Sequence, residues 1–241
     1  MRAIRFENAG NADVIKLVEE PVPQVRPHDL LVRVYAAGLN RADILQRQGF
    51  YGERPDFGDS VVPGLEIAGE VVELGAAATG FRNGDRVMAI VGGGARAEYA
   101  RVDSRMAMVI PDRLSDAAAA AIPEVFVTAH EALIHLGKLT SGGWALIHAA
   151  AGGVGSAAVI LAHALGAKTV FTASSRKRIE RINELGGYSR GGLPQTRLPR
   201  CYRPPRRRCG RGFHRRPLSG SESARPGTGW QTHPGRNVAR W

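Results

Sequence analysis

The stretch WALIHAAAGGVGSAAVILAHALGAKTVFTAS, residues 144–174, decides how this chain of 241 residues is organised. It reads as an apolar strand, a glycine-rich turn at residues 149–155, an apolar helix and a second strand. Glycines without a Cβ let the backbone approach a pyrophosphate closely, and the amide groups at the helix start point toward its negative charge. Because strand, turn and helix follow in this order, the turn predicts a dinucleotide-binding site and not only close helix packing.

The residues after the second strand indicate which dinucleotide would bind. A site that prefers NAD usually carries an Asp or Glu there to bind the ribose hydroxyls. This sequence has Ser-Ser-Arg-Lys-Arg at residues 174–178. Hydroxyls and cations suit a 2′-phosphate, which favours NADPH over NADH. The alternative is a serine that caps the next helix, followed by solvated charges.

The flanking segments place this unit in an α/β chain. Residues 1 to about 120 contain short β-type runs separated by Pro and Gly turn signals, which predict a small barrel or sandwich. These runs are LLVRVYAAG, IAGEVVELG, DRVMAIV and AEYARVD. From about Ser115 the pattern becomes helical, with Ser115 as a candidate cap and Pro123 as an interruption. Residues 121–187 then follow a β-α-β-α order, which is typical of a doubly wound parallel sheet.

The last part of the chain, residues 188–241, differs sharply in composition. It contains 13 Arg, no Lys and one acidic residue, together with seven Pro and eight Gly. This tail carries a charge of +12, whereas residues 1–187 carry −1, so the tail accounts for the net charge of +11. No sustained period of a helix or strand runs through it, and we expect it to be disordered.

Cysteine usage and hydropathy set the broad class. Both cysteines, Cys201 and Cys209, lie in the arginine-rich tail, so no disulfide framework is implied. The N-terminus does not resemble a signal peptide, and we see no run of about 18 apolar residues that could span a bilayer. These features predict a cytoplasmic protein without a membrane partner.

Several motifs in order carry a family resemblance that covers roughly residues 1–187. Together they resemble the zinc-independent quinone oxidoreductase branch of the medium-chain dehydrogenase/reductase superfamily, and most of all its p53-inducible NADPH-dependent type. The motifs are GLNRADILQRQG (38–49), PGLEIAGEV (63–71), GDRV (84–87), IPE (122–124) and AGGVG (151–155). The resemblance implies a GroES-like β-rich catalytic domain over residues 1–120 and the first part of a Rossmann NADPH-binding domain over residues 121–187.

The resemblance also bears on metals. Zinc-dependent members of the superfamily carry a cysteine near the position of Asn40 and a histidine in the motif that here reads GLE at residues 64–66. Neither ligand is present, nor is a four-cysteine lobe, so we expect no metal. Without a Lewis acid the hydride acceptor must already be electrophilic, and a quinone meets that condition.

The resemblance assigns expected roles to individual residues. Asn40 and Tyr51 are the candidate catalytic residues: Asn40 would lie near the nicotinamide and its ribose, and Tyr51 would contact the quinone and could donate a proton. The expected NADPH contacts are Asn40 and Thr128 at the nicotinamide, Gly152, Gly153 and Val154 at the pyrophosphate, and Ser175 and Lys177 at the 2′-phosphate.

Other residues fit a purely structural role as well. Tyr51 could simply cover the fold at a turn, and Phe50 and Phe57 could either line the quinone pocket or fill the barrel. Histidines in apolar contexts are expected to be core or surface residues, namely His130, His135 and His148. Two acidic residues of the family motifs, Glu66 and Asp85, are expected to hold turns of the barrel.

The tail suggests a displaced reading frame. Most arginine codons read one base later encode Val, Ala, Asp, Glu or Gly, and three tail segments then permit family-like sequences in the family's order: 195–202, 211–217 and 229–233. Our hypothesis is a one-base shift near codon 187, which the nucleotide sequence tests. The Rossmann part would then keep only two strands, so we expect poor solubility, weak or absent activity and a doubtful homodimer, which an intact member would form.

The sequence therefore predicts an NADPH-dependent quinone oxidoreductase that acts without a metal. The first alternative is reduction of an enone or enoyl thioester, because the same hydride chemistry serves both acceptors. The second alternative is nucleic-acid binding through the tail, since clustered arginines with Tyr202 and Phe213 could neutralise phosphates and stack on bases. We do not expect a specific nucleic-acid partner.

Overall fold

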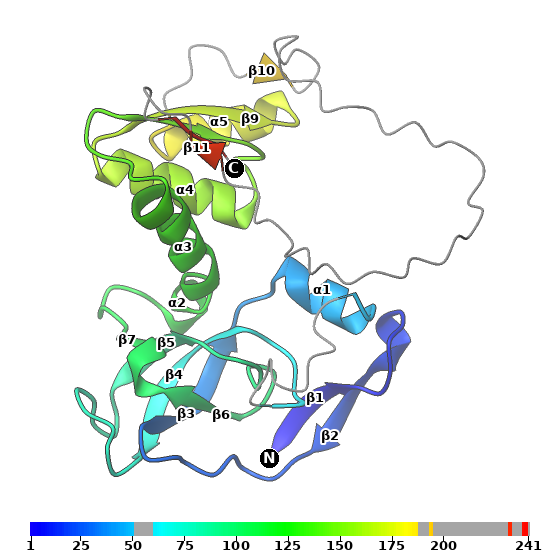
Figure 1. Cartoon of the computed structure of the whole chain (residues 1–241). Helices are drawn as coiled ribbons and strands as arrows, with labels where there is room; N and C mark the ends of the chain where they lie inside the picture. Colours follow the sequence, from blue (N-terminus) through cyan, green and yellow to red (C-terminus); the bar gives the residue numbers. More distant parts are fainter. Residues whose placement is uncertain (51–59, 188–192, 195–230, 233–237, 241) are drawn as a thin grey trace, which may run out of the picture. The chain divides into compact units, whose positions relative to one another are not determined.

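The computed structural model describes residues 1–50, 60–187, 193–194, 231–232 and 238–240 (Figure 1). The chain divides into two compact units, a first unit of Met1–Val127 and a second unit of Thr128–Trp241.

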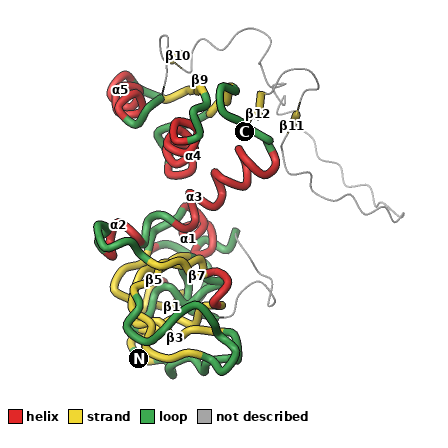
Figure 2. The backbone as a smooth tube through the Cα atoms, turned by 90° about the vertical axis from the view of Figure 1, so that its left-hand side faces the viewer, coloured by secondary structure: helices red, strands yellow, loops and turns green. Residues whose placement is uncertain are grey.

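The first unit is built on a five-stranded antiparallel sheet in the order β6-β3-β4-β5-β7. Figure 2 shows the strands of this unit in yellow, forming a curled sheet. Their bounds are β3 (Asp29–Ala37), β4 (Glu66–Leu74), β5 (Arg86–Ile90), β6 (Tyr99–Asp103) and β7 (Ala107–Val109). The β-type runs that the sequence predicts are β3 to β6, so that prediction is confirmed.

The core of this sheet is aliphatic and fully buried. Its largest members are Leu30, Val32, Ile67, Val71, Val87 and Val102. Gly69 on β4 pairs with Val34 beside a register shift in β3, and a Cβ there would meet the Arg33 carbonyl oxygen at 2.0 Å. A glycine is required because the two backbones approach this closely where the sheet curls.

Smaller elements complete the first unit. Strands β1 (Arg2–Phe6) and β2 (Ile15–Glu19) form an antiparallel pair, with the single-turn η1 (Ala12–Val14) between them. A bridge from Ala3 to Ala97 joins β1 to the segment before β6. Two further short elements are α1 (Arg41–Arg47) and η2 (Ser104–Met106).

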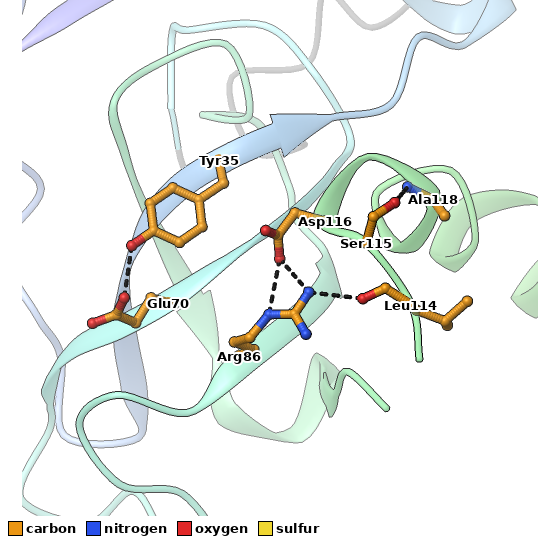
Figure 3. Close-up of polar contacts among 7 residues, drawn as sticks. All are labelled: Tyr35, Glu70, Arg86, Leu114, Ser115, Asp116 and Ala118. Carbon is orange, nitrogen blue, oxygen red and sulfur yellow. Dashed lines mark hydrogen bonds and ion pairs between the residues drawn. The ribbon is translucent and has the colours of Figure 1, made fainter. Parts of the chain in front are cut away.

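The helical part begins as the sequence predicts. Ser115 caps α2 (Asp116–Ala119), because its hydroxyl accepts the Ala118 amide at 3.3 Å (Figure 3). Arg86 on β5 ties this start to the sheet, since its guanidinium donates to the Asp116 carboxylate at 2.8 and 3.2 Å and to the Leu114 carbonyl at 2.8 Å. Helix α3 (Pro123–His130) then starts at the proline, which has no amide hydrogen to lose there.

Helix α3 runs into a π-helical turn, η3 (Glu131–Leu136). Counted from Asp116 to Leu136, this run of 21 residues is apolar and long enough to cross a membrane by length and composition alone. The expectation that no such run exists is therefore wrong. A third of the run is buried inside the protein, and core helices of soluble proteins meet the same criterion.

The second unit contains a five-stranded sheet in the order β10-β9-β8-β12-β11. Its well-formed centre is β8 (Trp144–Ile147), α4 (Gly153–Ala164), β9 (Lys168–Ala173) and α5 (Arg176–Glu184), with β8 and β9 parallel. Helices α4 and α5 pack against these strands (Figure 1). The buried side chains under them include Ala145, Ile147 and Phe171. From β10 through β9 to β8 the order matches strands 3-2-1 of a doubly wound sheet. On the other side the chain order is reversed, because β12 lies beside β8 and β11 lies outside it, antiparallel to β12. The predicted α/β class is confirmed.

The tail contributes more to this sheet than the sequence predicts. Leu193–Pro194 form β10 beside β9, Val238–Arg240 form β12 parallel to β8, and Gln231–Thr232 form β11 antiparallel to β12. The expectations of a tail without regular structure and of a two-stranded sheet are therefore wrong for these residues. The edges of β8 and β9 present backbone N–H and C=O groups that short extended segments can pair with, whatever their side chains.

Candidate functional site

The glycine turn opens onto a pocket of about 240 Å³ within the second unit. The lining is almost entirely apolar and comes from three places. It comprises Ala129, Ala132 and Leu133 of α3 and η3, Leu146 to His148 at the end of β8, and Ala149, Gly152 to Gly155 and Ala158 of the turn and α4. The pocket therefore meets the amino-terminal end of α4, where backbone amides lack helical partners.

Two glycines of the turn have different reasons to be glycine. A Cβ on Gly155 would lie 2.6 Å from the Ala150 Cα and 2.7 Å from the Ala149 carbonyl oxygen. A Cβ on Gly152 would meet only the Ala149 oxygen, at 3.3 Å. Gly155 is thus required by the packing of α4 on the strand end, whereas Gly152 leaves open space beside the helix start.

The turn is anchored to the neighbouring strand by Thr172 of β9, which is 3% exposed. Its hydroxyl accepts the Ala149 amide at 3.2 Å, and its carbonyl accepts the Ala150 amide at 3.0 Å. Ala149 has φ +50°, a left-handed conformation that costs a non-glycine residue free energy. His148 lines the pocket, with Nδ1 3.3 Å from the Thr172 hydroxyl. Two hydrogen bonds to Thr172 thus hold a strained turn in place.

The end of β9 presents the hydroxyls and cations that the sequence singles out. Ser174, Ser175, Lys177 and Arg178 are all exposed. Ser175 precedes α5, but its side chain makes no capping hydrogen bond, so the serine-cap alternative is not realised. Arg178 donates to the Ser174 hydroxyl at 2.6 Å, so a cation and a hydroxyl lie side by side. Such a cluster can bind a phosphate dianion.

Asn40 lies in the first unit, at the start of α1. Its backbone amide donates to the Asp43 carboxylate at 2.7 Å, and its side-chain amide donates to Glu66 Oε1 at 2.7 Å. Glu66 is 2% exposed, and its second oxygen accepts the Glu124 amide at 2.9 Å. Asn40 is therefore fixed through its backbone and through its side chain.

A buried ion pair supports this arrangement. Arg96 donates to the Asp43 carboxylate at 2.9 Å and to the Gly38 carbonyl at 2.5 Å. The two charged side chains are only 14% and 9% exposed. Burial, and then the nearby carboxylates of Glu66 and Asp43, raise the pKa of Glu124 above its ordinary value. The Arg96 guanidinium thus compensates the Asp43 carboxylate, while Glu66 and Glu124 depend on other groups.

Large apolar side chains at positions 39–61, in the same unit as Asn40, are exposed. Leu39 is 85% exposed, Phe50 79%, Val61 67% and Ile44 45%. Phe50 therefore does not fill the barrel, while Phe57 lies outside the described residues. Exposed apolar side chains of this kind are suited to contact with an apolar ligand.

Over the part of the chain that the structure describes, no three His, Cys, Asp or Glu side chains come close enough together to hold a metal ion.

Comparison with known proteins supplies the family. Residues 26–112 match the alcohol dehydrogenase GroES-like domain. The human synaptic vesicle membrane protein VAT-1 homolog is 36% identical over 188 residues, which is 77% of this chain and 47% of that protein. The solved quinone oxidoreductase of Thermus thermophilus, reported also in complex with NADPH, is 34% identical with a TM-score of 0.65, and the match covers 78% of this chain and 58% of that one.

This chain carries a GroES-like domain and is similar to quinone oxidoreductases of the medium-chain dehydrogenase/reductase superfamily. A further solved relative, the CurK enoyl reductase, is 28% identical with a TM-score of 0.70, covering 78% of this chain and 58% of that one. The chain spans about half the length of the curated relatives that it matches. The GroES-like domain that the motifs imply is confirmed.

Within this family framework the expected site residues are placed as follows. Gly152, Gly153 and Val154 meet in the pocket of the second unit, and Asn40 is anchored in the first. Thr128 is half-buried on α3, outside the lining of that pocket. Ser175 and Lys177 stand exposed at the start of α5, and Tyr51 lies outside the described residues. Their roles toward a ligand stay predictions.

Sequence reasoning missed three features of these two regions. It treated Glu66 as a turn residue, gave Arg96 no role, and placed His148 in the core or on the surface. The partners of Glu66 and Arg96 lie 26 to 58 positions away, so no local pattern reveals them. His148 could have been found, because it directly precedes the glycine turn.

Proposed function

We propose that this chain is an NADPH-dependent oxidoreductase that reduces a quinone by hydride transfer without a metal. One observation carries the proposal: a pocket at the amino-terminal end of α4, made by a glycine turn, is followed at the end of β9 by exposed serine hydroxyls and cations. The positions that would carry zinc ligands in other superfamily members hold Asn40 and the residues 64–66.

The residues present fit this cofactor. Gly152 leaves space beside the helix start, where backbone amides can donate to a pyrophosphate. Ser174, Ser175, Lys177 and Arg178 supply hydroxyls and cations for a 2′-phosphate, and none of them is an acid that would repel it. When bound, NADPH supplies a hydride from C4 of its nicotinamide.

The chain's own contribution is binding, orientation and exclusion of water. Asn40 is held in one orientation by Glu66, and its amide is proposed to meet the nicotinamide, while exposed apolar side chains such as Leu39 and Phe50 would cover a flat acceptor. Proximity and orientation of donor and acceptor supply most of the rate enhancement in this scheme. Thr128 is proposed beside the nicotinamide, and Tyr51 is proposed as the proton donor.

The test is oxidation of NADPH by the purified full-length chain, followed by absorbance with 1,4-naphthoquinone or 9,10-phenanthrenequinone as acceptor. We expect turnover with NADPH at the weak level expected of a shortened Rossmann part, and a much higher KM with NADH. Lys177→Met should raise the KM for NADPH about 10-fold, because a charge-assisted phosphate contact is lost. Arg176→Met is the matched control, since Arg176 pairs with Glu180 on the same helix.

Two results would contradict the proposal. One is the absence of NADPH oxidation with either quinone. The other is equal use of NADH and NADPH with no effect of Lys177→Met. The residues after β9 would then not bind the 2′-phosphate.

A second candidate is reduction of an activated enoyl thioester. The likeness to the CurK enoyl reductase favours it, and the same arrangement of residues could present a hydride to a conjugated carbonyl. An enoyl-CoA assayed beside the quinones separates the two: faster turnover of the thioester at equal concentration would move the assignment from the quinone to the enoyl acceptor.

A further inference from the structure

Glu66 is a buried carboxylate whose two oxygens accept from two different elements. Oε1 accepts the side-chain amide of Asn40 at the start of α1, at 2.7 Å. Oε2 accepts the backbone amide of Glu124 in the first turn of α3, at 2.9 Å. The side chain is almost fully removed from solvent, with the residue 2% exposed. Burying a carboxylate is costly unless such donors compensate it, so this placement calls for an explanation.

The chain makes room for Glu66 at one specific position. A Cβ on Gly38 would lie 2.2 Å from Glu66 Oε1 and 2.6 Å from the Ala120 carbonyl oxygen. Any residue larger than glycine at position 38 would therefore displace the carboxylate. Position 38 therefore needs a glycine for two reasons, the Glu66 carboxylate and the Ala120 backbone.

The Glu66 carboxylate decides which way the Asn40 amide points. An ionised carboxylate only accepts hydrogen bonds, so Asn40 must turn its nitrogen, and not its oxygen, toward Glu66. One of the two Nδ2 hydrogens is used there, while the other and the carbonyl oxygen remain for different partners. Asp43 holds the Asn40 backbone at the same time, at 2.7 Å. The side chain is therefore restricted to one rotamer and one amide orientation.

The same carboxylate also sets the start of α3. Its hydrogen bond to the Glu124 amide satisfies one of the donors that a helix start leaves open. Thr128 lies four residues after Glu124, and so one turn farther on the same face of α3. Glu66 thus joins two elements that each carry a residue assigned to the nicotinamide.

We propose that Glu66 is a positioning residue for hydride transfer, which acts by fixing the Asn40 amide and the start of α3. This inference rests on the proposed oxidoreductase function. It differs from a role in holding a turn of the barrel, because a turn residue would affect stability without affecting the orientation of Asn40. Glu70, on the same strand, provides the contrast: its carboxylate accepts the Tyr35 hydroxyl at 2.6 Å in an exposed pair (Figure 3).

The first test does not depend on activity. In the full-length protein, the Asn40 side-chain NH₂ resonances are identified by NMR from their loss in Asn40→Ala, and the exchange of these hydrogens and of the Glu124 amide is measured. Glu66→Gln offers one acceptor to two donors, so we expect at least one of these groups to exchange about 10-fold faster. Glu70→Gln is the matched control and should leave both unchanged.

The second test is kinetic. With a quinone as acceptor, Glu66→Gln should lower kcat about 10-fold while the KM for NADPH changes less than about 3-fold, because the orientation of Asn40 is lost and the cofactor pocket is not. In an Asn40→Ala background, Glu66→Gln should lower kcat by clearly less than it does in the wild type, since only its contact with the start of α3 is left to lose. If Glu66→Gln does not fold, Glu66→Asp takes its place in both tests. This variant keeps the negative charge, but its shorter side chain cannot contact both donors.

Unchanged exchange of both groups in Glu66→Gln would overturn the proposal, and so would fully additive effects of the Asn40 and Glu66 substitutions on kcat. If the wild-type chain oxidises no NADPH with any acceptor, the proposed function fails and with it the role in hydride transfer. The exchange measurement then still decides whether Glu66 fixes Asn40.

Discussion

The glycine turn of the second unit and the Asn40 segment of the first unit hold their polar groups in different ways. The turn offers backbone amides, an open apolar pocket and one supporting hydroxyl from Thr172. The Asn40 segment depends on charged side chains that are buried and paired, chiefly Glu66, Asp43 and Arg96. A site made from backbone is sensitive to added atoms, whereas a site made from buried charges is sensitive to lost partners.

The largest effect is expected where a buried charge loses its partner. Arg96→Met leaves the Asp43 carboxylate buried without its guanidinium and should lower the free energy of unfolding of the first unit by about 3 to 5 kcal/mol. Circular dichroism during denaturant unfolding measures it. Arg82→Met is the control: Arg82 is 88% exposed in its pair with Asp85, and its loss should cost less than about 1 kcal/mol. If both substitutions lowered the free energy of unfolding equally, the buried pair would be no more important than the exposed one.

The next effect tests the turn by adding a single methyl group. Gly155→Ala should lower the free energy of unfolding of the second unit by about 1 to 3 kcal/mol, because its Cβ would overlap the backbone of Ala150. Gly152→Ala should cost less, since its Cβ meets only one atom at 3.3 Å. Tryptophan fluorescence reports this unit selectively, as all three tryptophans lie in it. A larger cost at Gly152 would contradict the assigned packing.

A third substitution asks whether the turn depends on a side chain. Thr172→Val removes the hydroxyl that accepts the Ala149 amide and should cost about 1 to 2 kcal/mol, since that donor is left without this acceptor. Thr172→Ser keeps the hydroxyl and should recover most of the loss. If valine and serine behave alike, the anchoring hydrogen bond contributes nothing, and the turn is held by backbone alone.

The smallest effect concerns Glu124, whose pKa is raised by burial and by Glu66 and Asp43. The folded state therefore binds this proton more tightly than the unfolded state. Its contribution to stability is fully present below the ordinary value of 4.5 and falls as the pH rises above it. Glu124→Gln should remove this fall, so the variant is slightly more stable than the wild type at neutral pH and not at pH 4. Thermal unfolding of both proteins at a series of pH values measures this difference in stability. If the wild type became more stable relative to the variant as the pH rises, the prediction would be wrong.

Local patterns in the sequence determined much of the architecture. The alternation of apolar residues located β3 to β6, and the Ser115 cap and Pro123 marked the starts of α2 and α3. The glycine turn between two apolar strands located the pocket. Each of these features depends on neighbours within about one helical turn or one strand, which is why a sequence without structure reveals them.

The tertiary structure alone decided the partners of Glu66 and Asp43. Those partners are brought in by the register of β4 and by the return of the chain before β6 and at α3, over separations of 26 to 58 residues. It alone placed the short tail strands, because segments of two or three residues carry no readable period and pair through backbone groups. Local chemistry fixed what each segment of this chain becomes, and long-range packing fixed which side chains meet.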